Sequence, residues 1–343
     1  MPNLSSHLLK KIMLSTLKEL EVSDLSAQHV VESIVSTSLR GTDSHGINLF
    51  PHYWQVLKIG RVNKHPKFQF DRKSASLALL EADFALGHHA GAAAMDHVCE
   101  MAEETGAAFV SVKNSTHFGA AAYFGLMPAK RGMIGFSFTN ADSLVKVHNA
   151  KAAFFGTNPI CITAPLRDED PLCLDMATST VSWNKIRNHR SVNKPLESGW
   201  AHNEAGHSET DPHKATSLSP SGSYKGFGLG MFVEIFCGLL ASGPIGEEIG
   251  PMFTQLERKR SISHFFGAIN LGVLLKTEDF KARLQTMVNA IRQMPGIDGD
   301  AVMVPGDPEK KMLLKRLETG IPIETEKLNE FIKINSEFKQ AIL

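Results

Sequence analysis

Two histidines stand in short polar motifs that could carry acid–base chemistry. His45 lies in "TDSHG", where Ser44 and Asp43 could fix its tautomer and supply hydrogen bonds to a substrate oxygen. His117 lies in "NSTHFG", directly after a strand-like stretch. A histidine near a helix start is more often structural than catalytic, and a solvated loop residue is an equally ordinary interpretation of His45. Their chemistry therefore depends on which groups gather around them.

Polar side chains follow three predicted strands. His117 comes after "AAFVSVK", Asn140 and Asp142 come after "MIGFSFT", and Asp175 comes after "PLCL". Each residue alone is an ordinary cap or turn former. In an open α/β sheet, however, ligands bind where the carboxyl ends of strands meet loops and helix N-termini. The coincidence of three such positions favours one shared site.

A glycine-rich stretch, "GFGLG" at 226–230, superficially suggests dinucleotide binding. It does not fit GxGxxG, no strand leads into it, and it lies inside a helical pattern, so we reject a Rossmann site there. Lys225 and Gly226 are more informative, because they begin that helix. Free amides, the helix dipole and an ammonium group together would hold an anion such as a pyrophosphate.

Apolar periodicity predicts the elements that must position these residues. Helices are expected over 4–20 and 26–39. From residue 76 the rhythm alternates between strands and helices, which predicts an α/β layer. The strands are expected at 76–82, 107–113, 133–139, 158–164, 171–176 and 263–275, the helices at 87–105, 118–131 and 225–242, and a surface excursion at 188–223. We expect a central α/β cofactor-binding domain over 76–274, and a helical region over 1–75 that packs with 275–343.

Composition excludes several classes of partner. Among 343 residues, Lys plus Arg and Asp plus Glu both total 36, so no basic field exists for nucleic acid or an anionic membrane. The start lacks a signal-peptide pattern and no apolar run is long enough to span a bilayer, so a cytoplasmic protein with a small-molecule partner is expected. The four cysteines form no CxxC pair, and the thirteen histidines other than His45 and His117 lack acidic companions at ligand spacing, so no metal site is expected.

Six motifs in register resemble one known family. They are "RGTDSHG", "NSTHFG", "FGTNPI", "LDMATS", "GSYKGFGLG" and "VPGDPE". Together they resemble the malate/L-lactate dehydrogenase family outside the Rossmann superfamily, which includes ureidoglycolate dehydrogenase, 2,3-diketogulonate reductase, sulfolactate dehydrogenase and piperideine-2-carboxylate reductase. The resemblance covers nearly the whole chain. It implies a non-Rossmann α/β fold with a mixed sheet, flanking helices and a helical N-terminal region, in a homodimer that uses NAD or NADP.

The resemblance also implies roles for individual residues. The catalytic candidates are His45, His117 and Ser44, and the substrate would lie beside Asn48, His52, Thr157 and Asn158. The cofactor contacts correspond to Asn140, Asp142, Asp175, Met176, Ala177, Lys225, Gly226, Pro305, Gly306 and Asp307. His45 matches the proton donor of some relatives and His117 that of others. Because Ser44 and Asp43 flank His45, the sequence favours His45 as donor, with His117 binding substrate or ordering the nicotinamide pocket.

One position departs from the family pattern. Where relatives usually read "SHGxxR", this chain reads "SHGINL", so Leu49 replaces an arginine suited to a carboxylate, and His52 stands where a further arginine is common. The expected activity is hydride transfer between nicotinamide and C2 of a 2-oxo or 2-hydroxy acid. Alternatives are a reductase of a cyclic imine or diketo sugar acid, or a nucleotide-binding regulatory protein without turnover. Leu49 favours the regulatory protein, whereas intact His45, His117 and Lys225 favour an enzyme.

Overall fold

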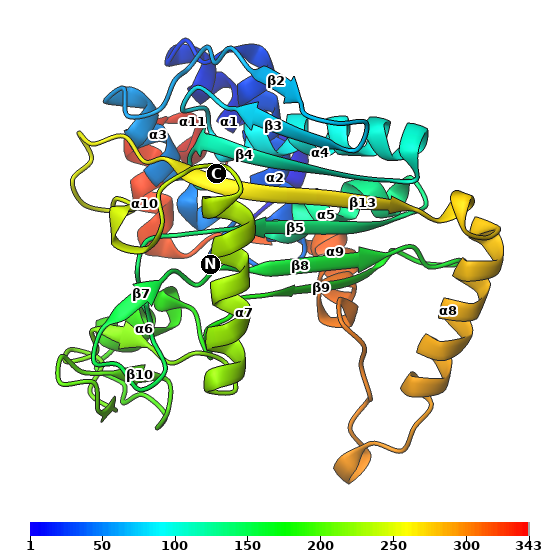
Figure 1. The fold of residues 1–343 in the computed structure, drawn as a ribbon. Helices are drawn as coiled ribbons and strands as arrows, with labels where there is room; N and C mark the ends of the chain where they lie inside the picture. The colour runs from blue at the N-terminus through cyan, green and yellow to red at the C-terminus, as the bar shows by residue number, and fades with distance from the viewer. Residues whose placement is uncertain (342–343) are drawn as a thin grey trace.

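A mixed β-sheet forms the centre of the molecule, whose computed structural model describes residues 1–341. Its seven strands lie in the order β2-β3-β4-β13-β5-β8-β9 (Figure 1). Their bounds are β2 (Gln69–Arg72), β3 (Leu77–Glu81), β4 (Ala107–Ser115), β5 (Met133–Thr139), β8 (Ile160–Ala164), β9 (Leu172–Met176) and β13 (Ile262–Asn270). The late strand predicted at 263–275 thus pairs in the middle of the sheet, where Phe266 lies opposite both Val110 and Ser137.

Strand direction decides which loops meet. Only β3 and β4 are parallel neighbours, and every other neighbouring pair in this sheet is antiparallel. It follows that β3, β4, β5 and β9 all point the same way. Their carboxyl ends therefore share one edge of the sheet with the amino ends of β8 and β13. This edge gathers the residues that follow β4, β5 and β9, as the strand-end argument requires.

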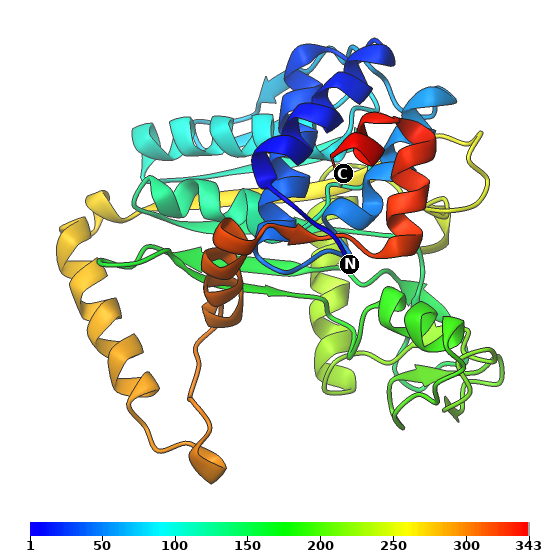
Figure 2. The same ribbon diagram turned by 180° about the vertical axis from the view of Figure 1, so that it is seen from behind.

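Helices cover both faces of this sheet. The helices α4 (Gly87–Thr105) and α5 (Ala121–Lys130) pack on one face, and α7 (Tyr224–Glu234) lies across the other (Figures 1 and 2). Alternation along β13 supplies both contacts, because Phe266 points into the core under α4 and α5 while Phe265 packs against Val233 and Cys237 of the α7 side. Beyond Glu234 the α7 segment continues as a π-helical turn, Ile235–Leu239.

The N-terminal helices share a core with the C-terminal ones. That group comprises α1 (Ser6–Glu19), α2 (Asp24–Leu39), α3 (Phe50–Lys58), α10 (Thr325–Ile334) and α11 (Glu337–Gln340). Leu9, Ile34, Phe50, Phe331 and Phe338 are fully buried in this cluster. A two-stranded sheet of β1 (Asn3–Leu4) and β14 (Ile321–Pro322) joins the ends of the chain to it, and Figure 2 shows both groups on the same side.

Two regions differ from the sequence expectation. The stretch 188–223 is not a bare surface excursion, because it holds β10 (Ala201–His202), β11 (Ser208–Glu209) and β12 (Ser217–Leu218). These strands pair with β6 (Val145–Lys146) and β7 (Ala153–Phe155), and with α6 (Trp183–Ser191) they enclose a small core around Trp200. The helix predicted from residue 118 begins instead at Ala121, because Gly119, at φ 79°, turns the chain first.

The C-terminal half also contains an extension from the body. The helix α8 (Thr277–Arg292) and the segment that follows it project away from the sheet before the chain returns at α9 (Asp307–Thr319) (Figure 1). Two short 3₁₀ turns at Ile47–Leu49 and Ile297–Gly299 complete the elements used below. None of the described helices combines the length and apolarity needed to cross a membrane.

Candidate active site

A cavity of about 1090 Å³ opens at the sheet edge where β4, β5 and β9 end. Its walls come from α2, the first turn of α5, the end of β9, the segments 251–254, 303–306 and 308–309, and residues 182–184 before and within α6. Sites for single small molecules are usually about 300–1,000 Å³, so this one has room for a dinucleotide and a small acid together. Of the residues singled out from the sequence, the cavity is bordered by Ser44, His45, His117, Asn140, Asp142, Thr157, Asp175, Met176, Ala177, Pro305 and Gly306.

Six candidates do not border this cavity: Asn48, His52, Asn158, Lys225, Gly226 and Asp307. Periodicity and motif order brought them into the prediction, but neither shows in which direction a side chain points. Asn48 is half-buried in the 3₁₀ turn Ile47–Leu49, and its side chain makes no hydrogen bond within residues 1–341.

The rings of His45 and His117 are stacked beside each other, and both residues border the cavity. Their ring centroids are 6.0 Å apart and their planes differ by 27°. Burial lowers the pKa of His45. Burial also holds the pKa of His117 well below its usual range, with further lowering from the neighbouring His45 and Arg260. Both imidazoles are therefore neutral near pH 7, and a protonated form of either would be a strong proton donor.

Tyr53 holds His117 in place, which the sequence analysis missed. Its hydroxyl lies 2.7 Å from His117 Nδ1, and the Gly119 N–H donates to the same nitrogen at 3.3 Å. Because a backbone N–H can only donate, Nδ1 is the acceptor and the proton of the neutral ring belongs on Nε2. Tyr53 is only 2% exposed, and a buried tyrosine hydroxyl needs a polar partner. That need was the one signal in the sequence that could have pointed to it.

The partners of His45 are fewer than expected. Ser44 Oγ lies 3.0 Å from His45 Nδ1, as the motif suggested. Asp43, however, does not orient the imidazole. Its two carboxylate oxygens receive a bidentate contact from Arg316 of α9 at 2.7 and 2.8 Å. Asp43 therefore fixes the 42–46 loop to α9, and His45 depends on Ser44 alone.

Asp175 joins the end of β9 to the start of α5. Its Oδ2 accepts the Ala122 N–H at 2.8 Å, which caps a helix whose own N-cap, Ala120, offers no side-chain bond. Its carboxylate is exposed to the cavity. Enclosure by the surrounding protein raises the pKa of Asp175 to about 6, and the Ala122 N–H partly offsets that rise. Asp175 thus faces the cavity with an acceptor that can also carry a proton near neutral pH.

Two asparagines converge on one buried carboxylate in α7. Asn158 Nδ2 donates to Glu234 Oε2 at 2.7 Å, and Asn140 Nδ2 donates to Glu234 Oε1 at 3.3 Å. Asn140 Oδ1 accepts the Ser263 N–H at 2.9 Å. Burial raises the pKa of Glu234, and the bonds from the asparagines reduce that rise. Asn158 therefore anchors the strand-leading loop to α7 rather than facing substrate, while Asn140 reaches the cavity wall with its amide already bonded.

No positive charge stands at the motif position where relatives usually carry an arginine. Leu49 borders the cavity, so the motif position offers apolar surface there. Asp142 also borders it, but its Oδ1 lies 2.5 Å from Nη2 of the buried Arg260. Burial, followed by Arg260 and Arg61, lowers the pKa of His52 to about 4. His52 is consequently neutral at physiological pH and supplies no positive charge in place of the missing arginine.

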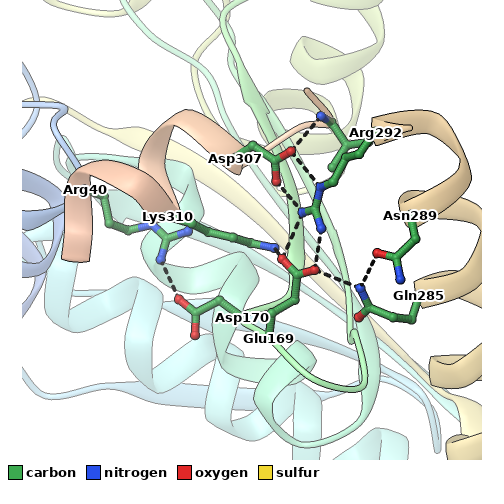
Figure 3. Close-up of polar contacts among 9 residues, drawn as sticks. Arg40, Glu169, Asp170, Gln285, Asn289, Arg292, Asp307 and Lys310 are labelled. Carbon is green, nitrogen blue, oxygen red and sulfur yellow. Dashed lines mark hydrogen bonds and ion pairs between the residues drawn. The ribbon is translucent and has the colours of Figure 1, made fainter. Parts of the chain in front are cut away.

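Asp307 belongs to an ion cluster at the base of α9 (Figure 3). Arg292 donates to Asp307 through Nε at 3.0 Å and through Nη2, and to Glu169 at 2.7 and 2.9 Å. Lys310 adds a contact to Glu169 at 2.6 Å. Burial would raise the pKa of Asp307, but the Arg292 and Val304 N–H bonds outweigh it and lower that pKa. The cluster positions Pro305 and Gly306, whose neighbour Cys173 donates its N–H to Pro305 O at 3.3 Å.

Lys225 and Gly226 stand in the first turn of α7, on the far side of the sheet from α5 (Figure 1). Lys225 is exposed, whereas Gly226 is buried against the backbone of Ser221 and Thr178, where a Cβ would lie 2.3 Å from Ser221 O. Within residues 1–341, no group of three or more His, Cys, Asp or Glu side chains is arranged to hold a metal ion. All four cysteines are free and buried.

Comparison with known proteins agrees with this geometry. The family profile described as malate/L-lactate dehydrogenase matches residues 4–331. The chain belongs to the malate/L-lactate dehydrogenase family. The malate dehydrogenase of Pyrococcus abyssi is 34% identical over 331 residues, covering 93% of this chain and 90% of the relative. The ureidoglycolate dehydrogenase (NAD(+)) of Escherichia coli O157:H7 is 31% identical over 300 residues, covering 87% and 85%.

A solved structure extends the likeness to the fold. The malate dehydrogenase of Pyrococcus horikoshii OT3 superposes with a TM-score of 0.89 at 30% identity, covering 98% of this chain and 95% of that one. The expected fold class and the family resemblance are confirmed. This malate/L-lactate dehydrogenase family member is therefore an oxidoreductase acting on hydroxy or oxo acids, and its family implies a nicotinamide cofactor.

Proposed function

We propose that the cavity is the active site of an NAD(P)-dependent 2-oxo-acid reductase, or of the reverse 2-hydroxy-acid dehydrogenase. The observation that carries the proposal is the meeting of His45 and His117 with the strand-end residues Asp175, Met176 and Ala177 in one cavity of about 1090 Å³. A regulatory protein without turnover would need no pair of neutral imidazoles in such a position.

The cavity wall fits a dinucleotide. Arg40 lines the cavity with a side chain only 9% exposed, and its Nη2 is buried without a hydrogen-bond partner among the described residues. The N–H groups of Ala120 and Ala121 also lack protein partners within residues 1–341, and both residues border the cavity at the start of α5. A guanidinium and free amides at a helix N-terminus suit phosphate oxygens. The Asp175 carboxylate would accept hydrogen bonds from ribose hydroxyl groups, and Pro305 and Gly306 would line the part of the cavity that the cofactor occupies.

When bound, the reduced nicotinamide supplies the hydride that C2 of an oxo acid accepts. His117 moves the matching proton from Nε2, because Tyr53 and Gly119 hold its Nδ1. This assignment reverses the preference drawn from the sequence, since Asp43 gives His45 no support. In the oxidation direction the base is the other neutral tautomer of the His117 ring, with its proton on Nδ1, where it is donated to the Tyr53 hydroxyl oxygen, so that the Nε2 lone pair is free to take the substrate proton. In the reduction direction the ring must first bind a proton on Nδ1; the imidazolium then donates Nε2–H and is left as the Nδ1–H tautomer, so reduction is faster at lower pH.

His45 and Ser44 bind and orient the substrate oxygen rather than exchange its proton. The Ser44 hydroxyl fixes the His45 ring at 3.0 Å, and Asn184 Nδ2 donates to the Ser44 carbonyl from α6 at 3.4 Å. Thr157 borders the same end of the cavity. These groups would exclude bulk water and hold the C2 oxygen against His117.

Leu49 bears on the choice of substrate. Relatives named malate, ureidoglycolate or sulfolactate dehydrogenase indicate acids of different shapes. With apolar surface from Leu49, Met252 and Phe253 beside the histidines, we propose a substrate whose group beyond C2 is not a second carboxylate. A cyclic imine or a diketo sugar acid remains the second candidate, because an imine nitrogen can take the proton from His117 as an alkoxide does.

A homodimer accounts for Lys225, which lies outside its own cavity. The outward face of the α7 segment exposes Leu229, Phe232, Leu239 and Leu240 at 45–60%. An apolar stripe of this kind marks an interaction surface. We propose that two copies meet there and that Lys225 serves a cofactor phosphate in the partner's site. We also propose a central cofactor-binding domain over 76–274, a helical region over 1–75 that packs with 275–343, and a cytoplasmic location.

A substrate screen tests this function. The protein is mixed with NADH or NADPH and with 2-oxo acids, diketo acids and cyclic imines, and the loss of nicotinamide absorbance is followed. Reduction of a 2-oxo acid at kcat/KM within the usual enzyme range, about 10⁴ M⁻¹s⁻¹ or more, is expected. Tight cofactor binding without turnover of any compound would favour the regulatory alternative.

A further inference from the structure

Two buried arginines share a single carboxylate beside the catalytic histidines. Arg61 and Arg260 are each 4% exposed. Arg260 donates through Nε to Gly250 O at 2.8 Å and contacts Asp142 through Nη2. Arg61 donates only to backbone carbonyls, those of Arg258, Met252 and Pro251, at 2.8–2.9 Å. Carbonyl groups satisfy its hydrogen bonds but carry no net charge.

The cluster of Arg61, Arg260 and Asp142 therefore has a net charge of +1 inside the protein. Arginine stays protonated in proteins, so deprotonation does not remove this charge. Glu257 also acts on Arg61 but is exposed, where solvent screens it. The nearby His52 is neutral, as shown above. Buried charge is unfavourable unless it is compensated, so the cluster is complete only when a further anion approaches.

A second, smaller cavity lies beside this charge and shares His117 with the main cavity. It measures about 20 Å³ and is bordered by His52, Tyr53, Arg61, Thr116, His117 and Arg260, with Val56 and Val62. Such a volume admits about one water molecule. Arg260, whose Nη1 makes no hydrogen bond within residues 1–341, is one of the residues that border this cavity. His117 borders both cavities, so an oxygen beside its ring can be within one water of Arg260.

We propose that the Arg61–Arg260–Asp142 cluster is the counter-charge of the substrate's carboxylate, reached through one water in the small cavity. The proposal rests on the proposed function and names how its substrate is recognised. It explains how a chain with Leu49 at the usual arginine position still selects a monocarboxylic 2-oxo acid. The substrate's carboxylate would be bound by way of the loop that precedes β13 rather than by the 42–49 loop. Water-mediated contacts of this kind hold ligands nearly as well as direct ones.

The test compares an acid with its own uncharged amide. kcat/KM is measured for the best 2-oxo acid from the screen and for the matching 2-oxo amide, with wild type and with Arg260→Gln. This change leaves Arg61 with Asp142, so the net charge of the cluster falls from +1 to 0. The acid-to-amide ratio should fall about 10- to 150-fold, the range of a charge-assisted hydrogen bond.

Two further variants keep the result interpretable. Arg258→Gln removes an arginine from the same loop, but this side chain is exposed and donates only to Glu248 O at 3.2 Å, so the ratio should not change. Asp142→Asn raises the net charge of the cluster to +2 and should raise the ratio, a result that does not depend on whether Arg260→Gln folds. A wild-type ratio near one, an unchanged ratio in Arg260→Gln, or a lower ratio with Asp142→Asn would overturn the proposal. Failure to reduce any 2-oxo acid would instead refute the proposed function.

Discussion

Replacing Tyr53 with phenylalanine removes one hydroxyl and keeps the ring. That hydroxyl lies 2.7 Å from His117 Nδ1, and within residues 1–341 the only other partner of this nitrogen is the Gly119 N–H at 3.3 Å. With the shorter contact gone, the imidazole can rotate away from the orientation that these two contacts hold. A positioned acid–base group contributes about 10²- to 10⁴-fold to the rate. Losing the positioning but not the imidazole should lower kcat by roughly 10-fold or more, but by no more than that contribution.

The same change should cost modest stability. A net hydrogen bond contributes about 0.5–1.5 kcal/mol, and a buried group left without its partner costs about 1–3 kcal/mol. The Tyr53 side chain is buried, so Tyr53→Phe should lower the free energy of unfolding by about 1–3 kcal/mol. It should leave the Kd of the reduced cofactor nearly unchanged, because Tyr53 does not border the main cavity.

The assay is steady-state reduction from pH 5 to 9, with urea unfolding and cofactor titration alongside. Tyr123→Phe is the control: it removes the same hydroxyl from a tyrosine that borders the main cavity, and the Tyr123 hydroxyl makes no hydrogen bond within residues 1–341. Wild type should lose reduction rate as pH rises, because His117 must bind a proton. Equal kcat and an unshifted pH profile for Tyr53→Phe, or an equal loss for Tyr123→Phe, would refute the role given to this contact.

Three other outcomes are expected. Leu49→Arg should raise kcat/KM for oxaloacetate, whose second carboxylate has no partner in the wild type, about 10- to 150-fold while lowering it for the native substrate, and unchanged specificity would contradict the role of position 49. Lys225→Ala should weaken binding of the reduced cofactor by roughly 1 to 3 kcal/mol, measured by titration of a folded dimer, whereas unaltered affinity removes Lys225 from any cofactor site. Burial lowers the pKa of His88 and of His264 to about 3, so both rings are neutral in the folded state, whereas in the unfolded chain they bind protons below about pH 6.5. The free energy of unfolding should therefore decrease as the pH falls from about 6.5 towards 3. In urea unfolding, His264→Gln should make this decrease smaller.

Strand periodicity and strand ends could be predicted from the sequence because they are local properties. Alternation in 133–139 and 171–176 identifies β5 and β9, and the residues that follow them meet in the cavity. The order of strands was not available in the same way. β13 enters the sheet between β4 and β5, and this long-range pairing is what aligns the carboxyl ends of those two strands.

Side-chain direction and partner choice account for what the sequence missed. Asp43 looked like a partner of His45, but the competing guanidinium of Arg316 comes from a helix almost the full length of the chain away. Asn158 likewise follows its motif but bonds to Glu234 on α7. Arg260 carries no motif at all, since only the folded loop places it beside His117 and Asp142. Such contacts depend on tertiary structure, which spacing along the chain does not encode.

The most direct test of the active-site assignment separates turnover from cofactor binding in His117→Ala. On the best substrate from the screen, kcat should fall about 10²- to 10⁴-fold, while the Kd of the reduced cofactor changes by no more than a few fold. His45→Ala, measured beside it, should mainly raise KM. If both variants keep near-normal turnover, the cavity at the ends of β4, β5 and β9 is not where the proton is transferred.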